Sequence, residues 1–107
     1  MALTKVFNET VRLRAQRDPA FRRGLLCAGL ESLFEGELGA GKGVLRDYIN
    51  ATLGFEELAL QVGKSSKSLH RMFGPHGNPS SANLLAVISA LQRVDRIKLE
   101  ISAADAA

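Results

Sequence analysis

The sequence predicts a small all-α domain that ends in one short β-strand. Apolar residues recur at helical spacing through most of the chain, and glycine and proline breakers divide it into successive helices. Only 6 % of the 107 residues are aromatic and none is Trp, so the core must be mostly aliphatic, which suits packed helices. Hydrophobic residues make up 46 % of the chain, which is enough for a modest core and too many for a disordered protein.

The first two helices are separated by a sharp restart signal. The first helix covers roughly Thr4 to Gln16, with Thr4 as its N-cap and an apolar stripe made of Leu3, Val6, Phe7 and Val11. Asp18-Pro19 then places a capping carboxylate before a proline at the first helical position, so a second helix runs from Pro19 to about Phe34. The residues available for its buried face are Phe21, Leu25, Leu26, Leu30, Leu33 and Phe34.

Glycines separate the second helix from a third. Gly36 and Gly39 end the second helix, and the third runs from about Gly41 to Thr52, closed by Gly54. Its apolar face has i, i+3, i+4, i+7 spacing and consists of Leu45, Tyr48, Ile49 and Thr52. The run from Gly36 to Gly43 nearly fits a P-loop, but Gly43 offers no hydroxyl to Mg²⁺ and no strand precedes it. The glycines are therefore interpreted as a helix–helix linker.

The stretch from Phe55 to Gly74 predicts two short helices joined by a tight turn. Gly63 lies at the turn, where a Cβ has no room and φ is often positive. The apolar residues that fall on one face of each helix are Leu58, Ala59 and Val62 in the first, and Leu69 and Met72 in the second. This is the layout of a DNA-reading helix-turn-helix. The alternative is an αα-corner with a solvated basic face.

A breaker-rich loop and a last helix follow. The segment Gly74–Pro79 requires the preceding helix to stop by Phe73 or Gly74. Ser80 or Ser81 then caps a helix whose apolar stripe is Leu84, Val87, Ile88 and Leu91.

The chain ends in an alternating segment. From Arg96 to Ile101 polar and apolar residues alternate, which predicts a short strand, and no second strand is visible in the sequence. We therefore expect this strand to pair with its copy in a homodimer. A frayed or helical tail, or dimerisation through the N-terminal helices, is the alternative. The expected organisation is an N-terminal helical extension over 1–53, a DNA-binding core over 54–95, and a strand and tail over 96–107.

The charge distribution favours an anionic partner. The formal net charge is only +3, but no acidic residue lies between Glu57 and Asp95, while Lys64, Lys67, Arg71 and Arg93 all do. A second basic cluster near the N-terminus is more simply explained as a solvated helix face. It consists of Arg12, Arg14, Arg17, Arg22 and Arg23.

The second helix of the pair has the residue types that read DNA. Ser65 stands at an N-cap position, the first turn carries Ser66 and Lys67, and basic residues follow one turn later on the same side. Arg and Lys can pair with guanine, whereas serine and asparagine can also reach phosphates. The Gly77 amide is a further candidate donor in the loop behind the helix. The residues predicted to contact DNA are Lys64, Ser65, Ser66, Lys67, Ser68, His70, Arg71 and Asn78.

The motif around this helix also resembles a known family. Residues 55–91, with Glu56-Glu57-Leu58-Ala59, resemble the lambda-repressor-like (Xre-type) helix-turn-helix domain. The run from Ser68 to Ser80, with Gly77-Asn78-Pro79-Ser80, and then Asn83-Leu84 resembles HigA-like addiction-module antitoxins. The resemblance implies a dimeric repressor of its own operon that binds operator DNA and neutralises a RelE/ParE-like toxin. Action mainly by toxin neutralisation, or as a stand-alone regulator, is the alternative. Lys64 departs from the family, where an apolar residue follows the turn glycine.

Other classes of function have little support. His70 and His76 have no second ligand at metal spacing and no nearby carboxylate, so we expect no catalytic residue, metal site or cofactor. Cys27 is the only cysteine and lies in an apolar helical pattern, which favours a buried, reduced thiol. No apolar run is long enough to cross a bilayer, so we expect a cytoplasmic protein that makes no membrane contact.

Overall fold

A computed structural model shows an all-helical bundle. It describes the backbone of residues 2–106 and the side chains of residues 9–106, within which the chain forms six helices and no strand. The helices are α1 (Ala2–Arg17), α2 (Pro19–Phe34), α3 (Leu38–Ala51), α4 (Gly54–Val62), α5 (Ser66–Met72) and α6 (Ser81–Asp95). Of the predicted apolar stripe of the first helix, Leu3, Val6 and Phe7 lie outside the described side chains, and Val11 is half-buried.

Capping residues explain where the helices begin. The Asp18 carboxylate accepts a hydrogen bond from the Phe21 amide at 3.1 Å, and Pro19 follows it as predicted. The Ser80 hydroxyl accepts from the Asn83 amide at 3.1 Å and so starts α6. α1 differs from the prediction, because it begins at Ala2 and Thr4 lies inside it.

The glycines between α2 and α3 are only partly a linker. Gly36 has φ +84° and forms the turn, whereas Gly39, Gly41 and Gly43 lie within α3. A Cβ on Gly41 would lie 2.6 Å from a Leu33 methyl and 3.0 Å from the Gly29 carbonyl oxygen. The absence of a side chain at Gly41 therefore lets α2 and α3 pack closely.

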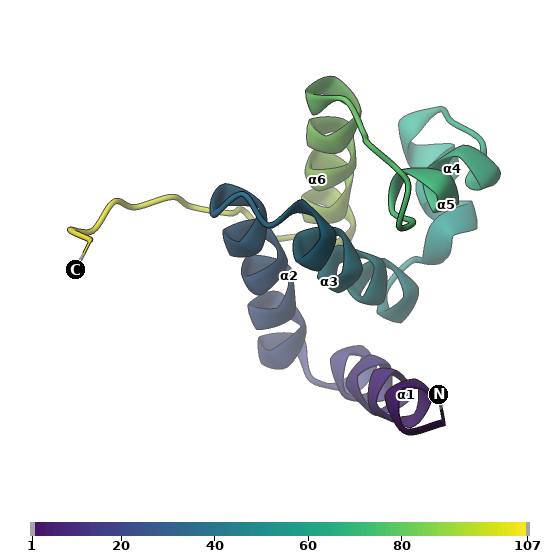
Figure 1. Ribbon diagram of the computed structural model, residues 1–107, viewed down its shortest axis with the longest axis horizontal. Coiled ribbons are helices and arrows are strands. Elements are labelled where there is room, and N and C mark those ends of the chain that lie inside the picture. Colours follow the sequence, from purple (N-terminus) through teal and green to yellow (C-terminus); the bar gives the residue numbers. More distant parts are fainter. Residues whose placement is uncertain (1, 107) are drawn as a thin grey trace.

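One hydrophobic core joins the five helices α2 to α6. Figure 1 shows how these helices are arranged in space. It extends across the predicted boundary at residue 53, because α2 and α3 contribute to the same buried cluster as α4 to α6. The largest fully buried side chains include Tyr48, Phe73, Leu26, Leu45, Ile49, Leu58, Leu69, Leu91 and Val87. Burial of these apolar side chains is the main force that stabilises the bundle.

Two predictions about the second helix are wrong. Cys27 is exposed, and Phe34 is 73 % exposed. The buried face of α2 is formed by Leu26, Gly29 and Leu30. Cys27 is next to Leu26 in sequence and so is rotated about 100° around the helix axis, away from that face.

A partly buried ion pair joins the first turn of α2 to the end of α6. Arg22 on α2 lies 3.0 Å from the Asp95 carboxylate at the end of α6, and the Arg22 guanidinium also donates to the Ala15 carbonyl at 2.9 Å. The Tyr48 hydroxyl donates to the same carboxylate at 3.1 Å. Burial and the charge on Asp95 raise the pKa of Tyr48 above the ordinary tyrosine value.

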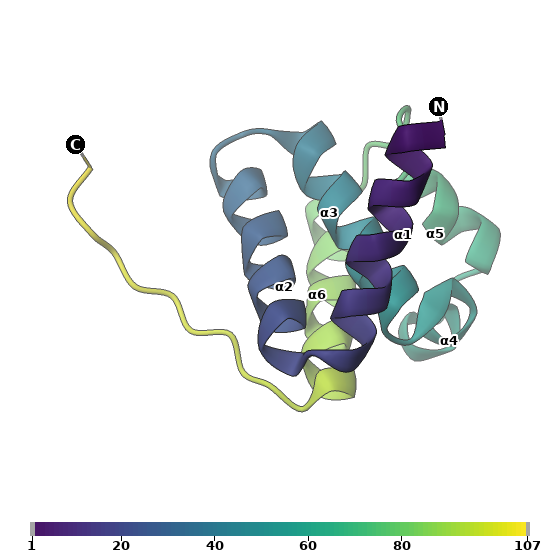
Figure 2. The ribbon, with the colours of Figure 1, turned by 90° about the horizontal axis from the view of Figure 1, so that it is seen from below.

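The predicted C-terminal strand is not formed. Arg96 has φ +53°, and the Ile97 amide donates to the Gln92 carbonyl at 3.0 Å, which closes α6 and reverses the chain. Ile97 and Leu99 then pack against the core, and the Leu99 amide donates to the Gln92 side chain at 2.9 Å. The apolar residues Ile97 and Leu99 of the alternating segment are therefore buried within one chain, and the described residues 2–106 contain no strand with which the segment could pair. The segment beyond leaves the bundle as an extended tail (Figure 2).

Candidate nucleic-acid interface

The helix pair α4–α5 holds the residues that the sequence predicts to bind DNA. The two helices are joined by a turn in which Gly63 has φ +69°, a left-handed conformation that glycine adopts without strain. Leu58 and Leu69 are completely buried, and Ala59 and Met72 are nearly so. Their predicted faces are thus confirmed, and the opposite side of α5 is left to solvent.

Ser65 begins α5 as predicted. Its hydroxyl oxygen accepts a hydrogen bond from the Ser68 amide at 3.0 Å. The hydroxyl proton is still available to donate to an anion, because the cap uses Ser65 only as an acceptor. The neighbouring Ser66 and Ser68 are half-buried.

The cations of this region have exposed and unneutralised side chains. Lys67 and Arg71 are exposed, and Lys64 is half-buried beside the turn. Within the described residues the ion pairs are Arg14–Asp18 and Arg22–Asp95, and neither involves these three side chains. The positive charge of α5 therefore faces water without a carboxylate partner.

His70 is exposed but not free to move. Its ring stacks on Phe55 with the centroids 4.2 Å apart and an interplanar angle of 29°. Phe55 is itself buried at the start of α4. The stacking links α4 to α5 and fixes the orientation of the imidazole. His70 belongs to the same short helix as Lys67 and Arg71.

The loop after α5 is pressed against the end of that helix. A Cβ on Gly77 would lie 2.1 Å from the Arg71 carbonyl oxygen, so only glycine fits there. The Gly77 amide donates to the Gly74 carbonyl at 3.1 Å. The prediction that this amide binds DNA is therefore wrong, because it is used within the loop. Asn78 is exposed.

Sequence reasoning missed the residues that hold this loop. Lys42 is only 4 % exposed, and its ammonium group donates to the carbonyls of Gly74 at 2.8 Å and Gly77 at 2.6 Å. Arg46 donates from Nη1 to the Phe73 carbonyl at 3.1 Å. Both cations thus bind carbonyls at or just beyond the C-terminal end of α5, where a helix dipole favours positive charge.

The signal that could have found them lies on α3. Gly39, Lys42, Gly43 and Arg46 follow i, i+3, i+4, i+7 spacing, which places them on one face of a helix. The glycines from Gly36 to Gly43 are interpreted from the sequence as a helix–helix linker, although the third helix is predicted to begin at about Gly41. The residues instead line one side of a cavity next to the loop.

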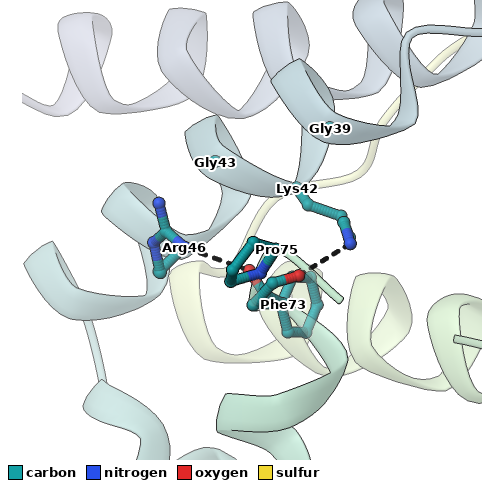
Figure 3. Close-up of a pocket in the computed structure, with 7 residues that line it drawn as sticks. Gly39, Lys42, Gly43, Arg46, Phe73 and Pro75 are labelled. Atoms are coloured by element: carbon teal, nitrogen blue, oxygen red, sulfur yellow. Dashed lines mark hydrogen bonds between the residues drawn. The ribbon is translucent and has the colours of Figure 1, made fainter. Parts of the chain in front are cut away.

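This cavity has a volume of about 380 Å³. It is lined by Gly39, Lys42, Gly43, Arg46, Phe73, Gly74 and Pro75, none of which is acidic. Figure 3 shows Lys42 and Arg46 reaching from α3 toward the backbone of Phe73 to Pro75.

Two further observations limit the chemistry of the molecule. Within the described residues, no group of three or more His, Cys, Asp or Glu side chains is placed to hold a metal ion. Among the same residues, no helix combines the length and the apolar character needed to span a membrane.

Comparison with known proteins adds no assignment. No family model, curated protein or solved structure matches this chain.

Proposed function

We propose that this chain is a sequence-specific DNA-binding regulator that represses transcription. In this proposal α4 and α5 form a helix-turn-helix of the lambda-repressor-like type, and α5 enters the major groove. The observation that carries it is the exposed and unneutralised basic side of α5, in a stretch without acidic residues. Ser65, Lys67, His70 and Arg71 supply the donors, and Lys64, Ser66, Ser68 and Asn78 complete the contact surface.

Direct binding tests this proposal. A labelled duplex from the DNA immediately upstream of the protein's own coding sequence is titrated, with fluorescence anisotropy as readout, at two salt concentrations. We expect it to bind more tightly than a random duplex of the same length. Equal binding of the two duplexes contradicts the sequence-specific function.

Two substitutions locate the reading surface. Lys67→Ala and Arg71→Ala each weaken binding to the specific duplex by roughly 1–3 kcal/mol, with little effect on the random duplex, if the side chains read bases. An equal loss on both duplexes assigns them to phosphates instead. Glu57→Ala, on the exposed side of α4, is a charge-changing control that is expected to leave the preference unchanged.

The second candidate function is neutralisation of a toxin. It is supported by the resemblance of residues 68–84 to HigA-like antitoxins, and the same chain can carry both functions as a repressor of its own operon. A neighbouring reading frame for a small basic RelE/ParE-like protein favours this function. If expression of that RelE/ParE-like protein arrests growth, co-expression of the present chain should restore growth. Failure to restore growth contradicts the antitoxin function.

A homodimer follows from the size of the reading helix. α5 has seven residues, so a single copy reaches few base pairs, and two copies are needed to read a longer operator. The tail is our proposed interface, because Ile101 is 83 % exposed and continues the alternation begun by Ile97 and Leu99. The N-terminal helices are the alternative interface.

A further inference from the structure

We propose that the cavity between α3 and the loop after α5 binds one phosphate group of the DNA backbone, with Arg46 as its main ligand. This inference rests on the proposed DNA-binding function and extends it to residues outside the helix pair. The cavity lies at the C-terminal end of α5, beside the helix that is proposed to enter the groove. A backbone phosphate flanking that groove is the anion it would meet.

The lining of the cavity has the chemistry of a phosphate site. Two of its seven residues, Lys42 and Arg46, are cationic and none is acidic. The Lys42 ammonium is held by the Gly74 and Gly77 carbonyls, which have no formal charge and, as dipoles at the end of α5, offset the ammonium charge only in part. A charge in so buried a position acts strongly on an anion nearby, because it is poorly screened by water.

Arg46 has donors to spare. A guanidinium has five N–H groups, and the contact from Nη1 to the Phe73 carbonyl fixes its position while using one of them. Arg46 is exposed, so the remaining donors can reach a ligand from solvent. Arginine is well suited to this task, because its planar fork matches two phosphate oxygens at once.

Glycine keeps the space above α3 open. A Cβ on Gly43 would meet only the Arg46 Nη2 atom, at 3.9 Å, and a Cβ on Gly39 would meet nothing within 4 Å. Both glycines face the cavity from the same side of α3 as the two cations. A phosphate can therefore approach the helix backbone closely at this point.

Asp47 is an acidic residue that interacts electrostatically with Arg46. Burial raises the pKa of Asp47, while Arg46 and Arg12 act against this rise. Asp47 is thus shared between two arginines and is not among the residues that line the cavity.

The test measures how binding depends on salt. The slope of log affinity against log salt falls by about 0.9 for each phosphate contact that is lost. We expect Arg46→Gln to lower this slope by about 1 and to weaken binding to the specific and the random duplex by the same factor. Arg23→Gln, at an exposed position of α2 in the cluster interpreted as a solvated helix face, is the matched charge control and should leave the slope unchanged.

A second pair of variants separates charge from shape. Gly43→Asp and Gly43→Asn add side chains of nearly the same size, but only aspartate places a negative charge beside Arg46. Gly43→Asp should therefore weaken duplex binding more than Gly43→Asn. Circular dichroism melting confirms that both variants are folded at the temperature of the assay.

The outcomes separate this inference from the proposed function. If the wild type prefers its upstream duplex but Arg46→Gln and Gly43→Asp leave the salt slope intact, the cavity site is wrong and the DNA-binding function stands. If the wild type binds neither duplex, both fail. A third outcome is that millimolar inorganic phosphate stabilises the wild type but not Arg46→Gln, while neither duplex binds. That result would assign the cavity to free phosphate and contradict the proposal that its ligand is a DNA phosphate.

Discussion

At the scale of single residues, Lys42 shows how a buried charge can shape a surface. Lysine is rarely buried unless its charge has partners. Here the partners are two carbonyls of the loop, so the side chain fixes the path of that loop relative to α3. Gly77 fixes the position of the same loop relative to α5, because no other residue fits against the Arg71 and Met72 carbonyls. Asn78 is thereby placed at a defined distance from the basic side of α5.

Lys42→Met therefore tests the anchor. Methionine retains most of the apolar stem but leaves the Gly74 and Gly77 carbonyls without their donor, so the free energy of unfolding should fall by about 1–3 kcal/mol. Urea denaturation measures the change. Lys98→Met, at an exposed position, is the control, and it should change stability by less than about 0.5 kcal/mol. Equal effects of the two substitutions would show that the loop does not depend on Lys42.

Tyr48 gives the molecule a defined response to alkaline pH. Its pKa is raised by burial and then by Asp95, so the folded state retains the phenol proton more strongly than the unfolded chain does. The resulting stabilisation is complete below the unfolded pKa of about 10 and is lost as the pH rises from there toward the folded value. The free energy of unfolding should consequently decrease above about pH 10.

Tyr48 is the only tyrosine of the chain, so tyrosinate absorbance reports this group alone. The absorbance should rise at a higher pH in the folded protein than in the protein unfolded by urea. Tyr48→Phe serves as the control for stability, because it removes the phenol while lysines and arginines still titrate. A decrease in stability above about pH 10 that is as steep in Tyr48→Phe as in the wild type would rule out Tyr48 as its source.

At the scale of elements, the C-terminal tail combines two kinds of residue. Ile97 and Leu99 pack on the core of their own chain, whereas Ile101 remains 83 % exposed. The first apolar residues of the alternating segment thus pack within the chain, whereas Ile101 at its end is exposed and could contact a second copy of the chain. Deletion from Arg96 onward would remove both contributions together, so point substitutions are more informative.

We expect Leu99→Ala to lower the free energy of unfolding by about 1–2 kcal/mol, because it removes half-buried apolar area. Ile101→Asp should leave the stability of a single copy nearly unchanged and dissociate the proposed homodimer, since it places a charge at the proposed interface. Sedimentation velocity measures the oligomeric state and urea denaturation the stability. A dimer that survives Ile101→Asp would place the interface elsewhere, with the N-terminal helices as the next candidate.

Most helix boundaries could be predicted from the sequence, because their causes are local. Asp18, Ser65 and Ser80 cap helices within three residues of themselves, and Gly63 adopts the positive φ expected at its turn. The stripe of α6 was predictable for the same reason. Its period is a property of the helix itself, whatever packs against it.

The features that were missed depend on contacts between distant parts of the chain. Lys42 and Gly77 are 35 residues apart, and no local pattern indicates that they meet. The strand was predicted from an alternation that is real, but which partner it faces is decided by the whole fold. Cys27 was misplaced because an apolar pattern does not by itself determine the edge of the buried face of α2.

At the scale of the whole molecule, the shared core makes the N-terminal helices part of the proposed DNA-binding unit. α2 and α3 bury Leu26, Leu30 and Leu45 in the same cluster as Leu58 and Leu69. The Arg22–Asp95 pair connects α2 with the end of α6, so the bundle is closed by contacts far apart in sequence. The segment from residue 54 onward therefore lacks a complete core of its own.

The continuity of this core couples folding to binding. A ligand that requires the folded helix pair also stabilises α2 and α3, because the two sets of helices unfold together. By the same linkage, under the proposed function a partner that opens α2 should lower DNA affinity without touching a nucleotide, and a partner that binds the folded α2 should raise it. α2 carries none of the proposed DNA contacts, so it is where we expect DNA binding to be controlled from a distance.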